Sequence, residues 1–173
     1  MPGFLNHYKS LLGPGQMKGA KGIYHSLSFT FISCRGYNAA LMTADQLREF
    51  AIRYAAAWCS QNAASVAAFF SPTASLKIDA ASPSMGRAAI AAAAQGFMTA
   101  FPDMAVIMDG LSIQGNHAVF RWTLTGKNTG PGGTGNAVQI SGYEEWTIGT
   151  DGLIADSKGH FDEAEYQRQL NTR

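Results

Sequence analysis

The sequence predicts one α+β domain in which a curved antiparallel sheet wraps around helices and forms a conical pocket. Three observations point to this fold. The 173 residues suffice for one ordinary domain and leave little room for a second. Apolar residues recur at helical spacing between residues 43 and 101, and strand-like segments follow between residues 104 and 159. Helices followed by a four- or five-stranded antiparallel meander are the element order of an α+β fold.

We expect the domain to occupy residues 42–173, with residues 1–41 as a poorly ordered N-terminal extension. The extension is punctuated by glycine, keeps no helical period and holds basic but no acidic residues. An upstream extension with Met42 as the first residue of the domain explains these features, and so does a targeting peptide. A third interpretation is a degenerate bacterial lipoprotein signal that starts at Met17 and ends at Cys34.

Three helices are predicted before the strands. The first begins at a capping box that starts at Thr43. Its apolar stripe consists of Leu47, Phe50, Ala51, Tyr54 and Trp58. The second helix begins at Asn62 and presents Phe70 before Ser71-Pro72 ends it. The third is an alanine-rich helix over Gly86–Phe101.

The strands and one terminal helix follow. The predicted strands are Ala74–Asp79, Met104–Met108, Leu111–Gln114, Ala118–Thr125, Val138–Ile148 and Leu153–Gly159. The pairs Gly115-Asn116 and Asp151-Gly152 supply turns. Asp162 is expected to cap a last helix that continues through Leu170.

The composition argues against several classes of function. A net charge of +1 does not suit a nucleic-acid binder, and no apolar run reaches the length of a membrane span. The four histidines are scattered without metal-site spacing. Cys34 and Cys59 form no disulfide framework, which favours a cytoplasmic location, with export through the N-terminal segment as the minor alternative. A charged fraction of only 14% favours a homodimer that covers part of the surface.

Strand parity singles out Glu144 as the chemically interesting residue. In the predicted strand Val138–Ile148, one face is apolar except for Glu144, because successive side chains alternate between the two faces. Burial on the helix side raises a carboxyl pKa above about 4.3, and a carboxylate tuned in this way suits proton abstraction beside a carbonyl. The structural alternative is a buried ion pair between Glu144 and Arg87 or Arg121.

Three segments carry a resemblance to a known family. The stretch RWTLTGKNTGP at Arg121–Pro131 is similar to the central strand and loop of SnoaL-like polyketide cyclases, in the nuclear transport factor 2-like superfamily. The stretch GYEEW at Gly142–Trp146, continued through DGLI at Asp151–Ile154, resembles the next hairpin of that family. GRAAI at Gly86–Ile90 fits the start of its third helix. The likeness spans roughly residues 43–171.

The resemblance implies a cone-fold homodimer that uses no metal and no organic cofactor. The best-known members close a ring of a polyketide ester by intramolecular aldol condensation. Their acid/base residue lies two positions after the strand glycine, which matches Glu144 after Gly142. Asn128 stands where many members have His, and Thr150 looks like an insertion in the hairpin.

Further residues are candidates for the same chemistry. An aldol closure needs a donor to the enolate oxygen, and Asn128, Trp122 or a second acid are the options. Asp156 and His160 lie on the last strand and by parity share a face with Ile154. For His160, a position in the core or at the pocket rim is the structural alternative.

The aromatic residues and the single pocket acid suggest the ligand class. The residues expected to line the pocket are Trp58, Phe70, Phe97, Phe101, Trp122 and Trp146. An apolar pocket with one or two polar groups suits a small hydrophobic carbonyl compound. The leading hypothesis is therefore a cofactor-independent enzyme of cyclase or isomerase type. The alternative is a non-catalytic small-molecule binding domain on the same dimeric scaffold, and a plain dimerising module is the third hypothesis.

Overall fold

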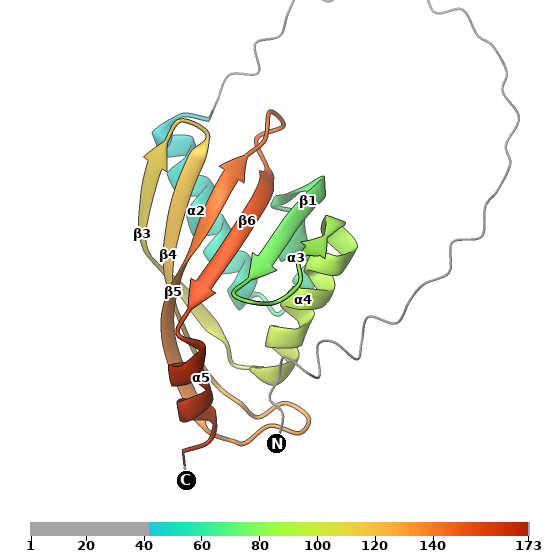
Figure 1. Ribbon diagram of the computed structural model, residues 1–173, viewed down its shortest axis with the longest axis vertical. Helices are drawn as coiled ribbons and strands as arrows, with labels where there is room; N and C mark the ends of the chain where they lie inside the picture. The colour runs from blue at the N-terminus through green and yellow to red at the C-terminus, as the bar shows by residue number, and fades with distance from the viewer. Residues whose placement is uncertain (1–41, 173) are drawn as a thin grey trace, which may run out of the picture. The chain divides into compact units, whose positions relative to one another are not determined.

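A computed structural model describes residues 42–172, so the interpretations of residues 1–41 lie outside the described residues. The described part confirms the α+β class (Figure 1). Its elements, in chain order, are α2 (Ala44–Cys59), α3 (Ala63–Ala67), β1 (Phe70–Ile78), β2 (Ser84–Met85), α4 (Gly86–Ala100), β3 (Ala105–Gln114), β4 (His117–Lys127), β5 (Ala137–Ile148), β6 (Ile154–Phe161) and α5 (Glu163–Leu170). Within this range no helix has the length and apolarity that crossing a membrane requires.

The sheet is larger than the predicted meander. Six strands follow the order β2-β1-β6-β5-β4-β3, and β3 to β6 form the expected antiparallel meander. The correction concerns β1, which pairs with β6 in parallel. The helix α4 separates β1 from the meander along the chain, so β1 joins the sheet at the free edge of β6 instead of forming a hairpin with β3.

The first helix forms as the sequence predicts. The Thr43 hydroxyl accepts a hydrogen bond from the Gln46 amide at 3.2 Å, and the Gln46 side chain accepts one from the Thr43 amide at 2.9 Å. This capping box satisfies free donors at the start of α2. The predicted stripe is buried: Leu47, Phe50, Ala51, Tyr54 and Trp58. Through this stripe α2 packs against β3. The packing places Tyr54 of α2 over the face of the sheet that holds the core.

The second helix is shorter than predicted, and the strand after it begins earlier. The helix ends at Ala67, and β1 begins at Phe70 and runs through Pro72. Pro72 does not stop the strand because the pairing of β1 with β6 is irregular between Phe70 and Ser75, where a residue without an amide N–H is tolerated.

The two extended segments predicted before the Gly115-Asn116 turn are a single strand, β3. Its register with β4 shifts between Met108 and Gly110, so that Asp109 has no directly opposed residue. Such a bulge interrupts the alternation of side chains and makes one strand look like two in the sequence. The remaining strand boundaries differ from the predicted ones by one or two residues.

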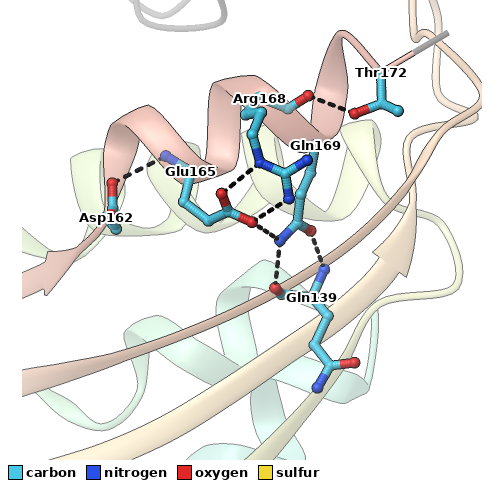
Figure 2. Close-up of polar contacts among 6 residues, drawn as sticks. All are labelled: Gln139, Asp162, Glu165, Arg168, Gln169 and Thr172. Carbon is cyan, nitrogen blue, oxygen red and sulfur yellow. Dashed lines mark hydrogen bonds and ion pairs between the residues drawn. The ribbon is translucent and has the colours of Figure 1, made fainter.

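The terminal helix α5 covers a strand edge that the sheet leaves open (Figure 2). Asp162 caps the helix, as predicted, by accepting a hydrogen bond from the Glu165 amide at 2.9 Å. Pairing between β5 and β6 ends at Gly142, so the backbone of Gln139 lacks a strand partner on that side. The Gln169 side chain takes this place, because it accepts from the Gln139 amide at 2.6 Å and donates to the Gln139 carbonyl at 2.9 Å. It imitates a neighbouring strand and protects the edge.

We predict that Gln169→Ala destabilises the domain by about 1–2 kcal/mol, because two hydrogen bonds to the backbone are lost. The expected fall in melting temperature is about 3–8 °C, measured by thermal unfolding of the full chain. Gln167→Ala is the matched control, since the Gln167 side chain on the same helix donates to Glu163, one turn away, and makes no hydrogen bond to β5 among residues 42–172. Equal melting temperatures for the two variants would contradict this role of Gln169.

Candidate active site

Glu144 lies in the middle of β5 on the face that carries the core. Ile140, Trp146 and Ile148 on that face are buried, whereas Tyr143 and Glu145 on the other face are exposed. Only 7% of the Glu144 surface is exposed. The parity argument is therefore confirmed: alternation along β5 places one carboxyl group among apolar side chains.

Three neutral donors from three elements surround the Glu144 carboxyl group. Tyr54 of α2 donates to Oε2 at 3.1 Å and lies 3.3 Å from Oε1. Trp146 Nε1 of β5 donates to Oε2 at 2.9 Å, and the Ser157 hydroxyl of β6 donates to Oε2 at 2.7 Å. Both Tyr54 and Ser157 are fully buried. The oxygen Oε2 thus receives three hydrogen bonds, and among residues 42–172 Oε1 has only the longer one from Tyr54.

Aromatic packing fixes the donors in place. The rings of Tyr54 and Trp146 meet edge to face at 5.1 Å, and Phe120 of β4 stacks on Trp146 at 4.8 Å. Phe120 is also the residue directly opposite Glu144 in the β4–β5 ladder. The carboxyl group is therefore held by side chains that have little freedom to rearrange.

Glu144 forms no ion pair with Arg87 or Arg121, so the ion-pair alternative is wrong. Arg87 Nε donates to the Phe70 carbonyl at 2.7 Å, and Arg121 donates to the Ser112 hydroxyl at 3.0 Å. Neither ion pair found among residues 42–172 includes Glu144. A buried carboxyl group that has neutral donors and no cation is stabilised in its protonated form by the apolar surroundings.

The pKa of Glu144 is raised, as the sequence predicts. Burial is the main cause, and the hydrogen bonds from Trp146, Ser157 and Tyr54 oppose it by favouring the charged form. The pKa of the Tyr54 hydroxyl is raised well above its usual value, first by burial and then by the charge of Glu144. Tyr54 therefore remains a protonated donor while Glu144 titrates.

A narrow cavity opens beside Glu144 on the helix side of the sheet. Its walls are Trp58, Leu76, Ile78, Phe97, Val106, Phe120, Trp122, Leu124, Ile140, Glu144, Gly159 and Phe161. The lining is apolar apart from Glu144, and the volume is about 50 Å³. Pockets that enclose a drug-sized ligand measure about 300–1,000 Å³. Trp122 and Phe161 are partly exposed, so they lie toward the outside, whereas Glu144 and Gly159 are buried.

The structure brings three of the six predicted lining residues to this cavity. Trp58 of α2, Phe97 of α4 and Trp122 of β4 line it. The other three, Phe70, Phe101 and Trp146, are nearly inaccessible and pack in the core. Trp146 still contributes through its hydrogen bond to Glu144.

Asn128 lies away from the cavity, at the start of the loop between β4 and β5. Its amide nitrogen donates to the Ala100 carbonyl at 3.2 Å, and its amide oxygen accepts from the Thr134 amide at 2.8 Å. Lys127, the residue before it, pairs with Ala137, seven positions along β5 from Glu144. At about 3.3 Å per residue, a side chain cannot span that separation. The structure therefore gives Asn128 the role of organising the loop.

Asp156 and His160 lie on the face of β6 opposite to Glu144. Gly159 is the β6 residue opposed to Glu144, and Ser157 contacts its carboxyl group, so the residues between and beside them point the other way. His160 stacks on Tyr143 at 4.7 Å, and its Nε2 lies 3.4 Å from Glu145. Asp156 accepts a hydrogen bond from Ser75. The structure does not bring these two residues into the Glu144 site.

Two residues of the site were not singled out in the sequence. Tyr54 was counted only as part of an apolar helical stripe, although a buried tyrosine hydroxyl usually finds a polar partner. Ser157 gave no signal, because its contact with Glu144 depends on the β5–β6 register. Among residues 42–172, no three His, Cys, Asp or Glu side chains gather closely enough to hold a metal ion.

A family model described as SnoaL-like domain matches residues 51–157, more than half of the chain. No curated protein matches the sequence. Among solved structures, TsrD from Streptomyces laurentii is similar at 22% identity with a TM-score of 0.66, over 75% of this chain and 98% of that one.

Two further structures have the same fold. A putative SnoaL-like polyketide cyclase from Jannaschia sp. CCS1 is 16% identical with a TM-score of 0.61, over 72% of this chain and 94% of that one. A hypothetical protein with a ketosteroid isomerase-like fold from Catenulispora acidiphila is 14% identical with a TM-score of 0.65, over the same shares of the two chains. The TM-scores of these three structures show the cone fold that the sequence predicts.

We predict that Glu144→Gln changes how stability depends on pH. Because the folded pKa of Glu144 is raised, its stabilising contribution is present below the unfolded pKa of about 4.3 and is lost as pH rises through the folded pKa. Each unit of difference between the two pKa values contributes about 1.4 kcal/mol. Thermal melts of the full chain from about pH 4 to about pH 8.5 should therefore show wild type losing stability relative to the variant.

The difference between the two curves isolates Glu144, since the other titrating groups are the same in both proteins. Parallel curves would mean that Glu144 titrates normally. A wild type that gains stability with pH would mean that the carboxylate form is the one the fold prefers.

Proposed function

The chain belongs to the SnoaL-like domain family, and from this premise we propose that it is a cofactor-independent enzyme acting on a hydrophobic carbonyl compound. The proposed reaction is of the polyketide cyclase or isomerase type, and Glu144 is the acid/base. The resemblance to a putative SnoaL-like polyketide cyclase supports the reaction class. The geometry of Glu144 supports the assignment of the residue.

The asymmetry of the Glu144 carboxyl group carries the proposal. Oε2 accepts hydrogen bonds from Tyr54, Trp146 and Ser157, which fixes the orientation of the group. Oε1 keeps unused lone-pair capacity, because its one contact is the 3.3 Å approach of Tyr54. A carboxylate with one anchored and one available oxygen, on the wall of an apolar cavity, is suited to moving a proton.

In the proposed reaction Glu144 begins as the carboxylate and removes a proton from the carbon beside a substrate carbonyl. The C–H electron pair forms a C=C bond, and the carbonyl electrons move to oxygen to give an enolate. In a cyclase the enolate carbon attacks a second carbonyl of the same molecule and forms a C–C bond. The resulting alkoxide recovers the proton from Glu144. In an isomerase the proton returns to a different carbon, and in both cases the carboxylate is regenerated.

The surroundings of Glu144 support this chemistry in two ways. Burial raises its pKa, and a stronger base removes a weakly acidic C–H proton more readily. The apolar walls, which include Leu76, Phe120 and Ile140, exclude water that would protonate the enolate at the wrong position.

The second candidate is a small-molecule binding domain without catalysis. The observation in its favour is the anchoring of Glu144, because a carboxyl group held by three donors also serves as a structural element that joins α2, β5 and β6. The narrow cavity of about 50 Å³ adds to this, since a polyketide-sized compound requires the outer side chains to move. Proton exchange distinguishes the two functions.

We predict that the full chain catalyses hydrogen–deuterium exchange at the carbon beside the carbonyl of small cyclic ketones in D₂O. Glu144→Gln should slow this exchange by about 10²–10⁴-fold, the usual contribution of a positioned acid/base. Exchange is followed by NMR or mass spectrometry. Glu145→Gln is the matched control, because this adjacent carboxyl group lies on the opposite, exposed face of β5. Equal rates for wild type and Glu144→Gln would leave the binding function.

A second variant for the same assay leaves Glu144 intact and narrows the cavity. A methyl group added at Gly159 would lie 3.7 Å from Glu144 Cγ and 3.9 Å from Ile78 Cγ1, which is ordinary contact. Gly159→Ala should therefore fold normally and slow the exchange of bulky ketones more than that of small ones. By contrast, Gly142→Ala would place its methyl group 2.3 Å from the His160 carbonyl oxygen, so we expect it to unfold the strand pairing.

We further propose that the enzyme is a homodimer that pairs through the outer face of the sheet. The low charged fraction supports this, as do Ile107 and Tyr143, which are 59% and 41% exposed on that face. Light scattering should give twice the mass of one chain, and Ile107→Glu should reduce it to one. Ile52→Glu on α2, which is 45% exposed, is the control. A monomeric wild type would contradict the proposal.

A further inference from the structure

Trp122 reaches the cavity from β4, on the same face of the sheet as Glu144. In the β4–β5 ladder Phe120 is opposite Glu144 and Trp122 is opposite Gly142. Trp122 and Glu144 are therefore diagonal neighbours, a separation of about 7–8 Å that long side chains bridge. Both residues line the cavity, so a small molecule between them contacts both.

The indole N–H of Trp122 is buried and makes no hydrogen bond with any of residues 42–172. It differs from Trp146, whose indole N–H donates to Glu144 at 2.9 Å. A buried donor without an acceptor is unfavourable, and most such groups in folded proteins are paired. Trp122 thus brings an unpaired donor to a cavity whose other lining residues are apolar, apart from Glu144.

The chain holds this indole in place from two sides. Gly142 lies so close beneath the ring that an added Cβ would be 2.6 Å from Cζ2 and 2.9 Å from Cη2 of Trp122. Phe161 of β6, which pairs with Gly142, has its ring centroid 6.4 Å from that of Trp122. The absence of a side chain at Gly142 therefore leaves the space that the Trp122 ring occupies, and the nearby Phe161 ring limits the movement of the indole.

We propose that the Trp122 indole N–H donates a hydrogen bond to the oxygen of a carbonyl compound bound in the cavity. Resting on the proposed function, this oxygen is the one that becomes the enolate oxygen when Glu144 removes the neighbouring proton. Trp122 is then the residue that selects ligands bearing an acceptor oxygen at that position. Asn128 does not supply this donor, because its amide nitrogen donates to the Ala100 carbonyl at the end of α4 and its amide oxygen accepts from Thr134 in the loop after β4.

The test compares two ligands of one shape, cyclohexanone and methylenecyclohexane, in which C=CH₂ replaces C=O. Affinities of the full chain are measured by NMR titration for wild type and for Trp122→Phe. The variant should weaken cyclohexanone about tenfold relative to methylenecyclohexane, which corresponds to about 1.4 kcal/mol. The affinity ratio of the two ligands is compared between wild type and variant, so that differences in hydration between the ligands cancel. Phe97→Leu, on another wall of the same cavity, should leave the ratio unchanged.

A second measurement uses the wild-type protein, so that it does not depend on how Trp122→Phe packs. The chain has three indole N–H signals, from Trp58, Trp122 and Trp146. On addition of cyclohexanone the Trp122 proton should move downfield, as expected for a new hydrogen bond. Methylenecyclohexane should not produce this shift, and the Trp146 signal, already bonded to Glu144, serves as the reference.

The outcomes test the role of Trp122 as a hydrogen-bond donor and the proposed enzymatic function separately. If the affinity ratio changes less than twofold, if the Trp122 proton does not shift while cyclohexanone binds, or if cyclohexanone does not bind, the role of Trp122 is overturned. A tenfold change without ketone exchange supports Trp122 as the ligand donor and removes the proposed enzyme. Ketone exchange that depends on Glu144, together with an unchanged affinity ratio, supports the proposed enzyme and removes the role of Trp122.

Discussion

The burial of Glu144 without a cation is the constraint on which the rest of the structure depends. A carboxyl group in apolar surroundings has to be satisfied by neutral donors, and these come from α2, β5 and β6. The helix must therefore pack with Tyr54 over the middle of the sheet, and β6 must pair with β5 in the one register that brings Ser157 beneath the carboxyl group. A slip of one residue in either strand would turn Glu144 or Ser157 to the opposite face. The polar cluster thus specifies how the helix and the strands fit together.

Under the proposed function, the same cluster gives Glu144 both a structural and a catalytic role. Anchoring of Oε2 removes the freedom of the carboxyl group to swing, while desolvation raises its pKa and leaves Oε1 available. An ion pair with an arginine would have anchored the group equally well, but the cation would have lowered the pKa and weakened the base. Neutral donors such as the Tyr54 hydroxyl and the Trp146 indole hold the position with a smaller loss of basicity. The engagement of Arg87 and Arg121 elsewhere is consistent with this arrangement.

Local patterns in the sequence predict which face of a strand or helix is buried. They do not predict the contacts between elements that are far apart in the chain. The capping box at Thr43 and the alternation around Glu144 are properties of consecutive residues, and the structure confirms both. The parallel pairing of β1 with β6 depends on residues far apart in the chain, and Pro72, which the sequence predicts as part of the end of the second helix, lies inside β1. Asp156 and His160 were placed by parity from Ile154, but the register of β5 and β6 shifts between Thr147 and Ile148, so counting from Ile154 gives the wrong face. Contacts that depend on strand register, such as that of Ser157 with Glu144, therefore cannot be predicted from local sequence patterns.

The two polar groups on the cavity wall give the cavity a chemical direction. Glu144 is buried and Trp122 is partly exposed, and the rest of the cavity lining is apolar. A ligand that satisfies both groups must carry an acceptor oxygen beside a carbon whose proton reaches the carboxyl group, and these features lie on adjacent atoms in an enolisable carbonyl compound. A hydrocarbon of the same shape leaves the indole N–H unpaired, and a charged ligand finds no cation on the wall to compensate it. Under the proposed function, a cavity lined in this way favours neutral ketones and esters. Because the cavity measures only about 50 Å³, the proposed function requires side chains of the cavity wall to move before larger members of this class can bind.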